Sequence, residues 1–130
     1  MNPFERGMSS SEGLHAIMDR LIVEGRSRVV KQTESHFFYN PMWSHFGDFP
    51  TSPSGTYFFN NSGHVLNYYW NIFDQVLIRP ELLPYFEHDD LLILTNAGEH
   101  SLLDTNGRPS KDYSDHLPIL FNLNLMKGEP

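Results

Sequence analysis

Apolar residues recur with helical spacing near the start of the chain. They lie three, four, seven and eight residues from the first, which places them on one face of a helix. These positions are Leu14, Ile17, Met18, Leu21 and Ile22. Ser9 and Glu12 have the spacing of a capping box, and Gly25 is a typical helix stop. The pattern predicts a helix over residues 10–24 with this apolar face in the core.

The rest of the chain alternates short apolar runs with turn-forming residues, as strands do. Residues 56–59 are rich in strand formers, and the turn at 60–63 predicts a hairpin with its second arm at 64–69. Residues 70–79 become continuously apolar before Pro80, which predicts a buried strand followed by one helical turn to about Phe86. Further strands are expected at 91–94 and 118–125. The prolines between 36 and 55 predict a long loop with a short turn around 42–46.

Composition fits a single globular domain. The chain has 130 residues, of which 39% are hydrophobic and 19% are charged. Because apolar strands need cover on both faces, the mixture of elements predicts an α/β (α+β) layered sandwich with a mixed, mostly antiparallel sheet. One amphipathic helix cannot cover four such strands. We therefore expect residues 1–130 to form a single partial domain.

The net charge and the absence of cysteine limit the classes of ligand that the chain is expected to bind. The formal net charge of −7 argues against a strong nonspecific grip on nucleic acid, which needs clustered Lys and Arg. The chain has no cysteine, so a metal would be held by oxygen or imidazole ligands and is expected to be Mg²⁺ or Mn²⁺. No apolar run has the length of a membrane span and no leader pattern is present, so the expected compartment is the cytoplasm.

An acid and an imidazole stand side by side at the mouth of the last predicted strand. The run Ser114-Asp115-His116-Leu117 leads directly into the alternating strand at 118–125. Charged and titratable groups at such a position cost desolvation unless a partner or ligand uses them. The plainer interpretation is an acid that caps the strand beside a surface histidine. The pair is nevertheless a candidate for phosphate chemistry.

Two motifs in this order resemble the endonuclease/exonuclease/phosphatase superfamily, which has a deoxyribonuclease-like fold. The first is Asp74-Gln75-Val76-Leu77, and the second, more specific one is Ser114-Asp115-His116-Leu117-Pro118-Ile119. The opening run Met1-Asn2-Pro3-Phe4-Glu5 is similar to the segment that follows the superfamily's Gly-Asp-Phe-Asn motif. The resemblance implies the C-terminal half of a four-layer α/β/β/α sandwich, without its N-terminal half.

The resemblance also implies catalytic roles for three residues. His116 would contact the scissile phosphate, Asp115 would help to position the metal and the attacking water, and Asp74 would orient the imidazole. An anionic neighbour fixes the tautomer of an imidazole and favours the cationic form, which stabilises charge on phosphoryl oxygens. The chain departs from the superfamily at Gln75, where a tyrosine is usual, and at Asn71 and Phe73.

Two elements of the superfamily site have no match. These are the glutamate that is the main metal ligand and the Gly-Asp-Phe-Asn motif whose aspartate activates water. Gly47-Asp48-Phe49-Pro50 shares three of the four motif letters, but it lacks the asparagine and follows no apolar strand. Because Asp115 alone would be a poor magnesium site, we expect the isolated chain to be inactive and its metal to be weak or absent.

The leading hypothesis is therefore the C-terminal part of a metal-dependent hydrolase that cleaves phosphodiester or phosphomonoester bonds. The expected partners are a phosphate-ester substrate, with nucleic acid among the candidates, and either a missing N-terminal half or a second copy of the chain. The alternative is a noncatalytic interaction module, or a half-domain complemented by another chain. The aromatic residues between 43 and 70 could stack on bases or sugars, although a small satellite core is the more common use of such residues.

Overall fold

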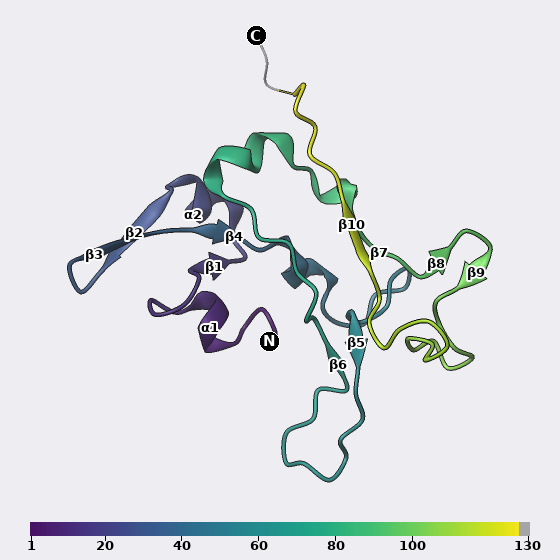
Figure 1. Cartoon of the computed structure of the whole chain (residues 1–130). Coiled ribbons are helices and arrows are strands. Elements are labelled where there is room, and N and C mark those ends of the chain that lie inside the picture. Colours follow the sequence, from purple (N-terminus) through teal and green to yellow (C-terminus); the bar gives the residue numbers. More distant parts are fainter. Residues whose placement is uncertain (128–130) are drawn as a thin grey trace.

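The computed structural model describes residues 1–127, which form a mixed α/β arrangement of few short helices and small sheets (Figure 1). The α-helices are α1 (Arg6–Ser9) and α2 (Arg20–Glu24), and the 3-10 helices are η1 (Pro41–His45), η2 (Pro80–Tyr85) and η3 (His88–Asp90). The strands are β1 (Ala16–Ile17), β2 (Ser27–Val30), β3 (Thr33–His36), β4 (Phe38–Tyr39), β5 (Tyr57–Phe58), β6 (Trp70–Asn71), β7 (Leu91–Ile93), β8 (Asn96–Ala97), β9 (His100–Ser101) and β10 (Ile119–Phe121).

The strands pair two by two, and most pairs are antiparallel. β2 pairs with β3, β5 with β6, β7 with β10, and β8 with β9, all antiparallel, whereas β1 and β4 are parallel. The strand prediction at 91–94 is confirmed by β7, whereas that at 118–125 is confirmed only over β10 and is wrong for residues 122–125. Figure 1 shows β10 lying along β7, while the β5–β6 hairpin projects away from the body.

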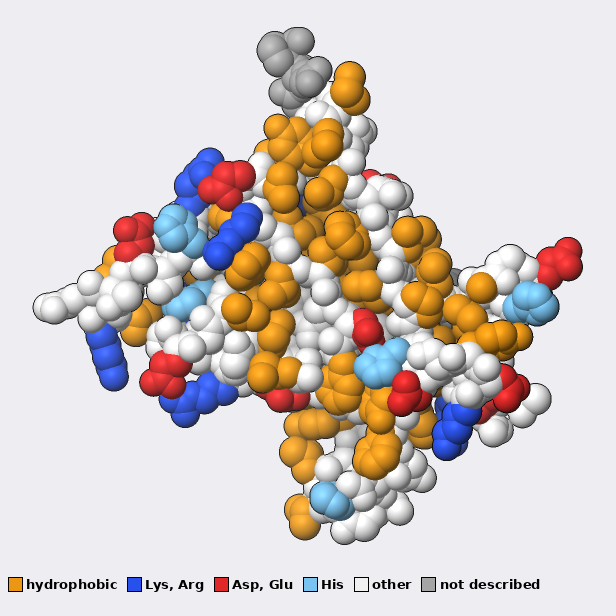
Figure 2. All heavy atoms as spheres, viewed as in Figure 1, with side chains coloured by type: hydrophobic (Ala, Val, Ile, Leu, Met, Phe, Trp, Pro, Cys, Tyr) orange, Lys and Arg blue, Asp and Glu red, His pale blue; other side chains and the backbone are white. Residues whose placement is uncertain are grey.

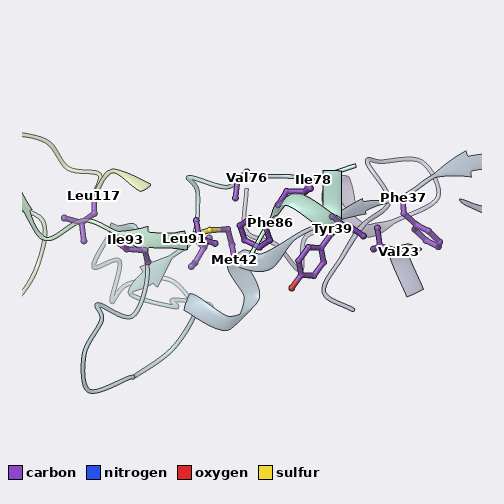
Figure 3. Packing of buried hydrophobic residues seen from close by; sticks show 12 residues of the cluster. Val23, Phe37, Tyr39, Met42, Val76, Ile78, Phe86, Leu91, Ile93 and Leu117 are labelled. Carbon is purple, nitrogen blue, oxygen red and sulfur yellow. The ribbon is translucent and has the colours of Figure 1, made fainter. Parts of the chain in front are cut away.

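One hydrophobic cluster connects both ends of the chain. Figure 3 shows it as a row of side chains that runs from Phe37 and Val23 at one end to Leu117 at the other. Phe86 and Met42, both fully buried, lie in the middle of this row. Because helices, 3-10 turns and strands each contribute only one or two side chains, the core depends on contacts between distant segments.

The helix predicted over residues 10–24 is wrong for residues 10–19. The chain is helical only at α2, which begins after Asp19, whose carboxylate accepts a hydrogen bond from the Ile22 N–H. Residues 16–17 instead pair with β4, and His15 has a φ of 50°. Most of the predicted core face is exposed, including Met18 at 55% and Leu21 at 78%. The predicted end at Gly25 is confirmed, since this residue follows α2 as its C-cap.

The strand predicted over residues 70–79 is regular only at its start. β6 covers Trp70–Asn71, and the following residues run irregularly to η2, apart from an antiparallel bridge between Ile78 and Tyr39. β6 is also the true partner of β5, whereas the second hairpin arm was predicted at 64–69. Gly55 allows the two arms to approach, because a Cβ there would lie 2.6 Å from the Asn71 carbonyl oxygen.

The two short turns predicted before and after this region are present as 3-10 helices. η1 covers the turn expected around 42–46, and η2 begins at Pro80 as expected. The Arg20 guanidinium donates hydrogen bonds to the carbonyls of Leu83 and Phe86 and so ties η2 to α2. Among residues 1–127, no helix is both long and apolar enough to cross a bilayer.

Candidate functional site

The structure brings Asp74 and His116 into direct contact. The distance between His116 Nδ1 and Asp74 Oδ2 is 2.7 Å, although the two residues are 42 positions apart in the chain. Their side chains are 40% and 34% exposed, so both can be reached from solvent. A bond of this kind places the Nδ1 proton toward the carboxylate and leaves Nε2 on the other side of the ring free to meet a ligand.

Neither residue lies within a strand. Asp74 follows β6, and His116 precedes β10 and forms an isolated antiparallel bridge with Tyr57 of β5. The two residues do not belong to paired neighbouring strands, because Tyr57 of β5 pairs with Asn71 on one side and bridges to His116 on the other. The two groups still meet at one rim, at the base of the hairpin.

Thr56 holds both sides of this contact. Its Oγ1 accepts hydrogen bonds from the N–H groups of Phe73 and Asp74, at 3.2 and 3.3 Å. Its carbonyl oxygen accepts from the Leu117 N–H at 2.7 Å, directly after the histidine. The residue is fully buried, so solvent does not compete for these bonds. Thr56 is thus a positioning residue for the Asp74–His116 pair, and the sequence analysis did not identify it.

Side-chain amides fix the segment around Asp74. The buried Asn2 accepts a hydrogen bond from the Ile72 N–H at 2.8 Å and donates to the Asn71 side chain. Gln75 donates to the Met1 and Ile72 carbonyls and accepts from Asn40 at 2.7 Å. These contacts replace strand pairing after β6, because each polar backbone group that leaves a ladder needs another partner.

Ser114 organises the other side of the site. Its hydroxyl accepts a hydrogen bond from the His116 N–H at 3.1 Å, in a local turn of the kind serine favours. Ser114, His116 and Asp74 line a shared hollow of about 280 Å³, together with Tyr113. The hollow therefore borders both members of the Asp74–His116 pair.

Asp115 faces a different part of the surface. It lines a larger hollow of about 710 Å³, which contains neither Asp74 nor His116 among its lining residues. Within residues 1–127, no three His, Asp or Glu side chains gather in a group that could hold a metal ion. Because Mg²⁺ and Mn²⁺ need several oxygen ligands, the described residues do not fit a metal site by themselves.

The partial Gly-Asp-Phe match lies elsewhere. Gly47-Asp48-Phe49 belongs to the loop after η1, and Phe49 lines a hollow of about 260 Å³ with His45 and His88. Burial, and next to it the neighbouring His88, lowers the pKa of His45. His88 is hydrogen-bonded to the Tyr39 hydroxyl, and burial raises the pKa of that tyrosine. This group of rings is separate from Asp74 and His116.

The aromatic residues between 43 and 70 do not form a single cluster. Phe4 lies 6.3 Å from Trp43, 5.9 Å from Phe46 and 5.2 Å from Tyr68, measured between ring centroids, and these four form a satellite cluster. Tyr57 does not belong to it, since its ring lies 4.8 Å from the His116 imidazole. The satellite-core interpretation therefore holds for Trp43 but not for Tyr57.

Replacing Thr56 by valine is expected to destabilise the fold by about 1 to 2 kcal/mol, because the Phe73 and Asp74 N–H groups lose their acceptor while the shape is kept. Urea denaturation of the variant measures this loss. Thr56→Ser retains the hydroxyl and should restore most of the stability, and Thr51→Val, at an exposed position, serves as the matched control. A Thr56→Val variant as stable as the wild type would contradict the positioning role.

Comparison with models of protein families, with curated proteins and with solved structures finds no match for this chain.

Proposed function

We propose that this chain forms the histidine-bearing, C-terminal part of a phosphoesterase of the endonuclease/exonuclease/phosphatase type, with the fold of half a four-layer α/β/β/α sandwich. It would hydrolyse phosphodiester or phosphomonoester bonds with the help of Mg²⁺ or Mn²⁺. The observation that supports the proposal is the 2.7 Å contact between Asp74 and His116, because the resemblance of the two motifs implies this contact between distant residues.

In the proposed reaction, a water oxygen forms a bond to phosphorus as the bond to the leaving oxygen breaks. Asp74 holds the Nδ1 side of the imidazole, so that Nε2 of His116 faces the phosphoryl group. In its cationic form the ring donates the Nε2 proton in a hydrogen bond to a phosphoryl oxygen, where negative charge grows in the transition state. The half-exposed pair and the adjoining hollow give a phosphate ester access to this position.

In the proposed reaction, groups outside the described residues activate the water and supply most of the metal ligands. Asp115 lines the neighbouring hollow and would approach the metal only as one of several ligands. The proposal therefore places the remaining carboxylates outside residues 1–127, on a preceding segment or on a second chain. The isolated chain is expected to be inactive for the same reason.

The test is hydrolysis of bis(p-nitrophenyl) phosphate and p-nitrophenyl phosphate by the natural protein, purified with any chain that is bound to it, with Mg²⁺, with Mn²⁺ and with EDTA. We expect metal-dependent release of nitrophenolate from at least one of the two esters. The chain of 130 residues alone is the matched comparison and should release little. If the natural protein, together with any chain bound to it, hydrolyses neither ester, nor any longer phosphodiester, the proposed function is wrong.

One observation favours the second candidate, a noncatalytic interaction module. In the β7–β10 sheet, Leu91 and Ile93 are buried, whereas Leu92 and its partner Leu120 are 50% and 46% exposed. Figure 2 shows hydrophobic side chains gathered in a broad band over the face of the molecule. An apolar surface of this kind marks an interaction site. In this candidate the chain binds a partner protein and does not bind a phosphate ester.

A further inference from the structure

The hairpin built from β5 and β6 projects away from the body of the protein (Figure 1). Residues 62–66 form its tip, and all of them are exposed. Val65 is fully exposed and Leu66 is 66% exposed, so two neighbouring apolar side chains stand in water at the protruding end. Because exposed apolar side chains that adjoin one another are a feature of interaction surfaces, the tip is a candidate for contact with another molecule or a lipid surface.

Charged side chains are absent from this part of the sequence. Residues 49–73 contain no Asp, Glu, Lys or Arg, although the chain carries 16 acidic and 9 basic residues. Figure 2 shows the projecting hairpin at the bottom of the molecule, where the visible side chains are hydrophobic or uncharged apart from one histidine. Removing a charged group from water is costly. The hairpin tip can therefore leave water without this cost.

Aromatic side chains surround the arms of the hairpin behind the tip. Phe59, Tyr68 and Tyr69 are each about half exposed. The Phe59 N–H donates a hydrogen bond to the Tyr69 carbonyl at 2.7 Å, and the Trp70 ring lies 5.5 Å from the Phe58 ring, so the arms hold these rings in place. Tyrosine and tryptophan combine an apolar ring with a polar group, and membrane proteins place them at the level of the lipid headgroups.

The shape of the tip favours a lipid surface over a protein partner. A specific protein interface buries about 800 Å² on each side, which two side chains on a narrow tip do not supply. A bilayer surrounds an inserted tip on all sides and accepts the rings behind it at the interface. The net charge of −7 favours a lipid without net charge, since an anionic surface would repel the rest of the chain.

We infer that the β5–β6 hairpin docks the protein on a zwitterionic lipid bilayer: Val65 and Leu66 enter the acyl-chain region, and Tyr68, Tyr69 and Trp70 lie among the headgroups. The attachment is weak and reversible, because its strength scales with the small apolar area that is buried. The inference goes beyond the proposed function and does not depend on it, since it requires neither a phosphate ester in the site nor a metal.

The β2–β3 hairpin provides a matched comparison within the same chain. Its strands also pair antiparallel, and its Val29 is 68% exposed, about as much as Leu66. This hairpin contains Arg28, Lys31 and Glu34, whose charges would have to leave water together with the valine. We therefore expect the β2–β3 hairpin to stay in water.

The first test is cosedimentation of the natural protein, purified with any chain that is bound to it, with sucrose-loaded vesicles of dioleoylphosphatidylcholine. We expect binding that Val65→Asp and Leu66→Asp each weaken by about tenfold or more. Val29→Asp introduces the same charge at an equally exposed position and should leave binding unchanged. Vesicles that also contain phosphatidylglycerol should bind more weakly at low salt.

The second test measures whether the tip enters the bilayer. The tryptophan introduced by Leu66→Trp should be quenched by phosphatidylcholine that is brominated on its acyl chains. The quenching should exceed that of the wild type, which contains Trp43 and Trp70. Val29→Trp is the control and should add no quenching.

The inference is wrong if the natural protein does not bind phosphatidylcholine vesicles, or if Leu66→Asp binds them as tightly as the wild type. Equal quenching of Leu66→Trp and Val29→Trp would also overturn it. Tighter binding to phosphatidylglycerol than to phosphatidylcholine would show that charge, and not the uncharged tip, directs the protein to lipid. A change of oligomeric state in Val65→Asp or Leu66→Asp without lipid would show that the tip contacts a protein.

Discussion

Replacing His116 by alanine is expected to lower the turnover of phosphate esters by about a hundred- to ten-thousandfold, the range usual for the loss of a proton-donating group in a transition state. The imidazole is the group that the Asp74 carboxylate orients at 2.7 Å. Without it, charge that develops on the phosphoryl oxygens loses its donor. Steady-state hydrolysis of bis(p-nitrophenyl) phosphate by the natural protein, purified with any chain that is bound to it and with Mg²⁺ present, measures the effect.

Two further variants serve as comparisons for His116→Ala. Asp74→Asn keeps the shape but replaces the carboxylate, so it should reduce turnover by less than the loss of the ring itself. His64→Ala removes an exposed histidine on the hairpin loop and should leave turnover unchanged. Turnover in His116→Ala within a factor of two of the wild type would show that hydrolysis occurs elsewhere in the protein.

Replacing Phe86 by alanine is expected to cost about 3 to 5 kcal/mol of unfolding free energy. The ring is fully buried in the middle of the hydrophobic cluster and lies 6.3 Å from the Tyr39 ring in an edge-to-face arrangement. A domain of this size has only about 5 to 15 kcal/mol of stability in total, so the variant should be close to unfolding. Thermal and urea denaturation, followed by circular dichroism, measure the loss.

Phe86→Leu extends the measurement if the alanine variant does not fold, because it fills part of the same volume and should lose less stability. Phe59→Ala removes an exposed ring and is the matched control, with an expected change of about 0.5 kcal/mol or less. If Phe86→Ala and Phe59→Ala had the same small effect, the cluster would not be the centre of the core.

The contact between Asp74 and His116 could be predicted from the sequence because the order and separation of two motifs imply it, although the chain departs from the first motif at Gln75. Thr56 could not be predicted. A threonine at the start of a β-rich run is an ordinary strand former, and its side-chain contacts with Phe73 and Asp74 depend on how the hairpin arms meet at Gly55. Such contacts are properties of the tertiary structure and leave no local pattern.

The error at residues 10–24 has a related cause. Helical spacing at Leu14, Ile17 and Leu21 is a local signal, but the Leu14 N–H bonds to the Gly7 carbonyl, and the next residues pair with β4. Gly13 fits there because a Cβ would lie 2.2 Å from the Gly7 carbonyl oxygen. Packing of Ala16, which is fully buried, outweighs the helix preference of its neighbours. The strand signals at 91–94 and 118–125 agreed with the tertiary pairing and were reliable.

The segment from Asn60 to Tyr69 joins β5 to β6 at the far end of the hairpin from Thr56. Substitutions, insertions and deletions in this segment can accumulate without disturbing the hydrogen bonds that Thr56 makes at the hairpin base. Related proteins can therefore acquire new ligand preferences by exchanging this segment while they inherit the same imidazole–carboxylate pair.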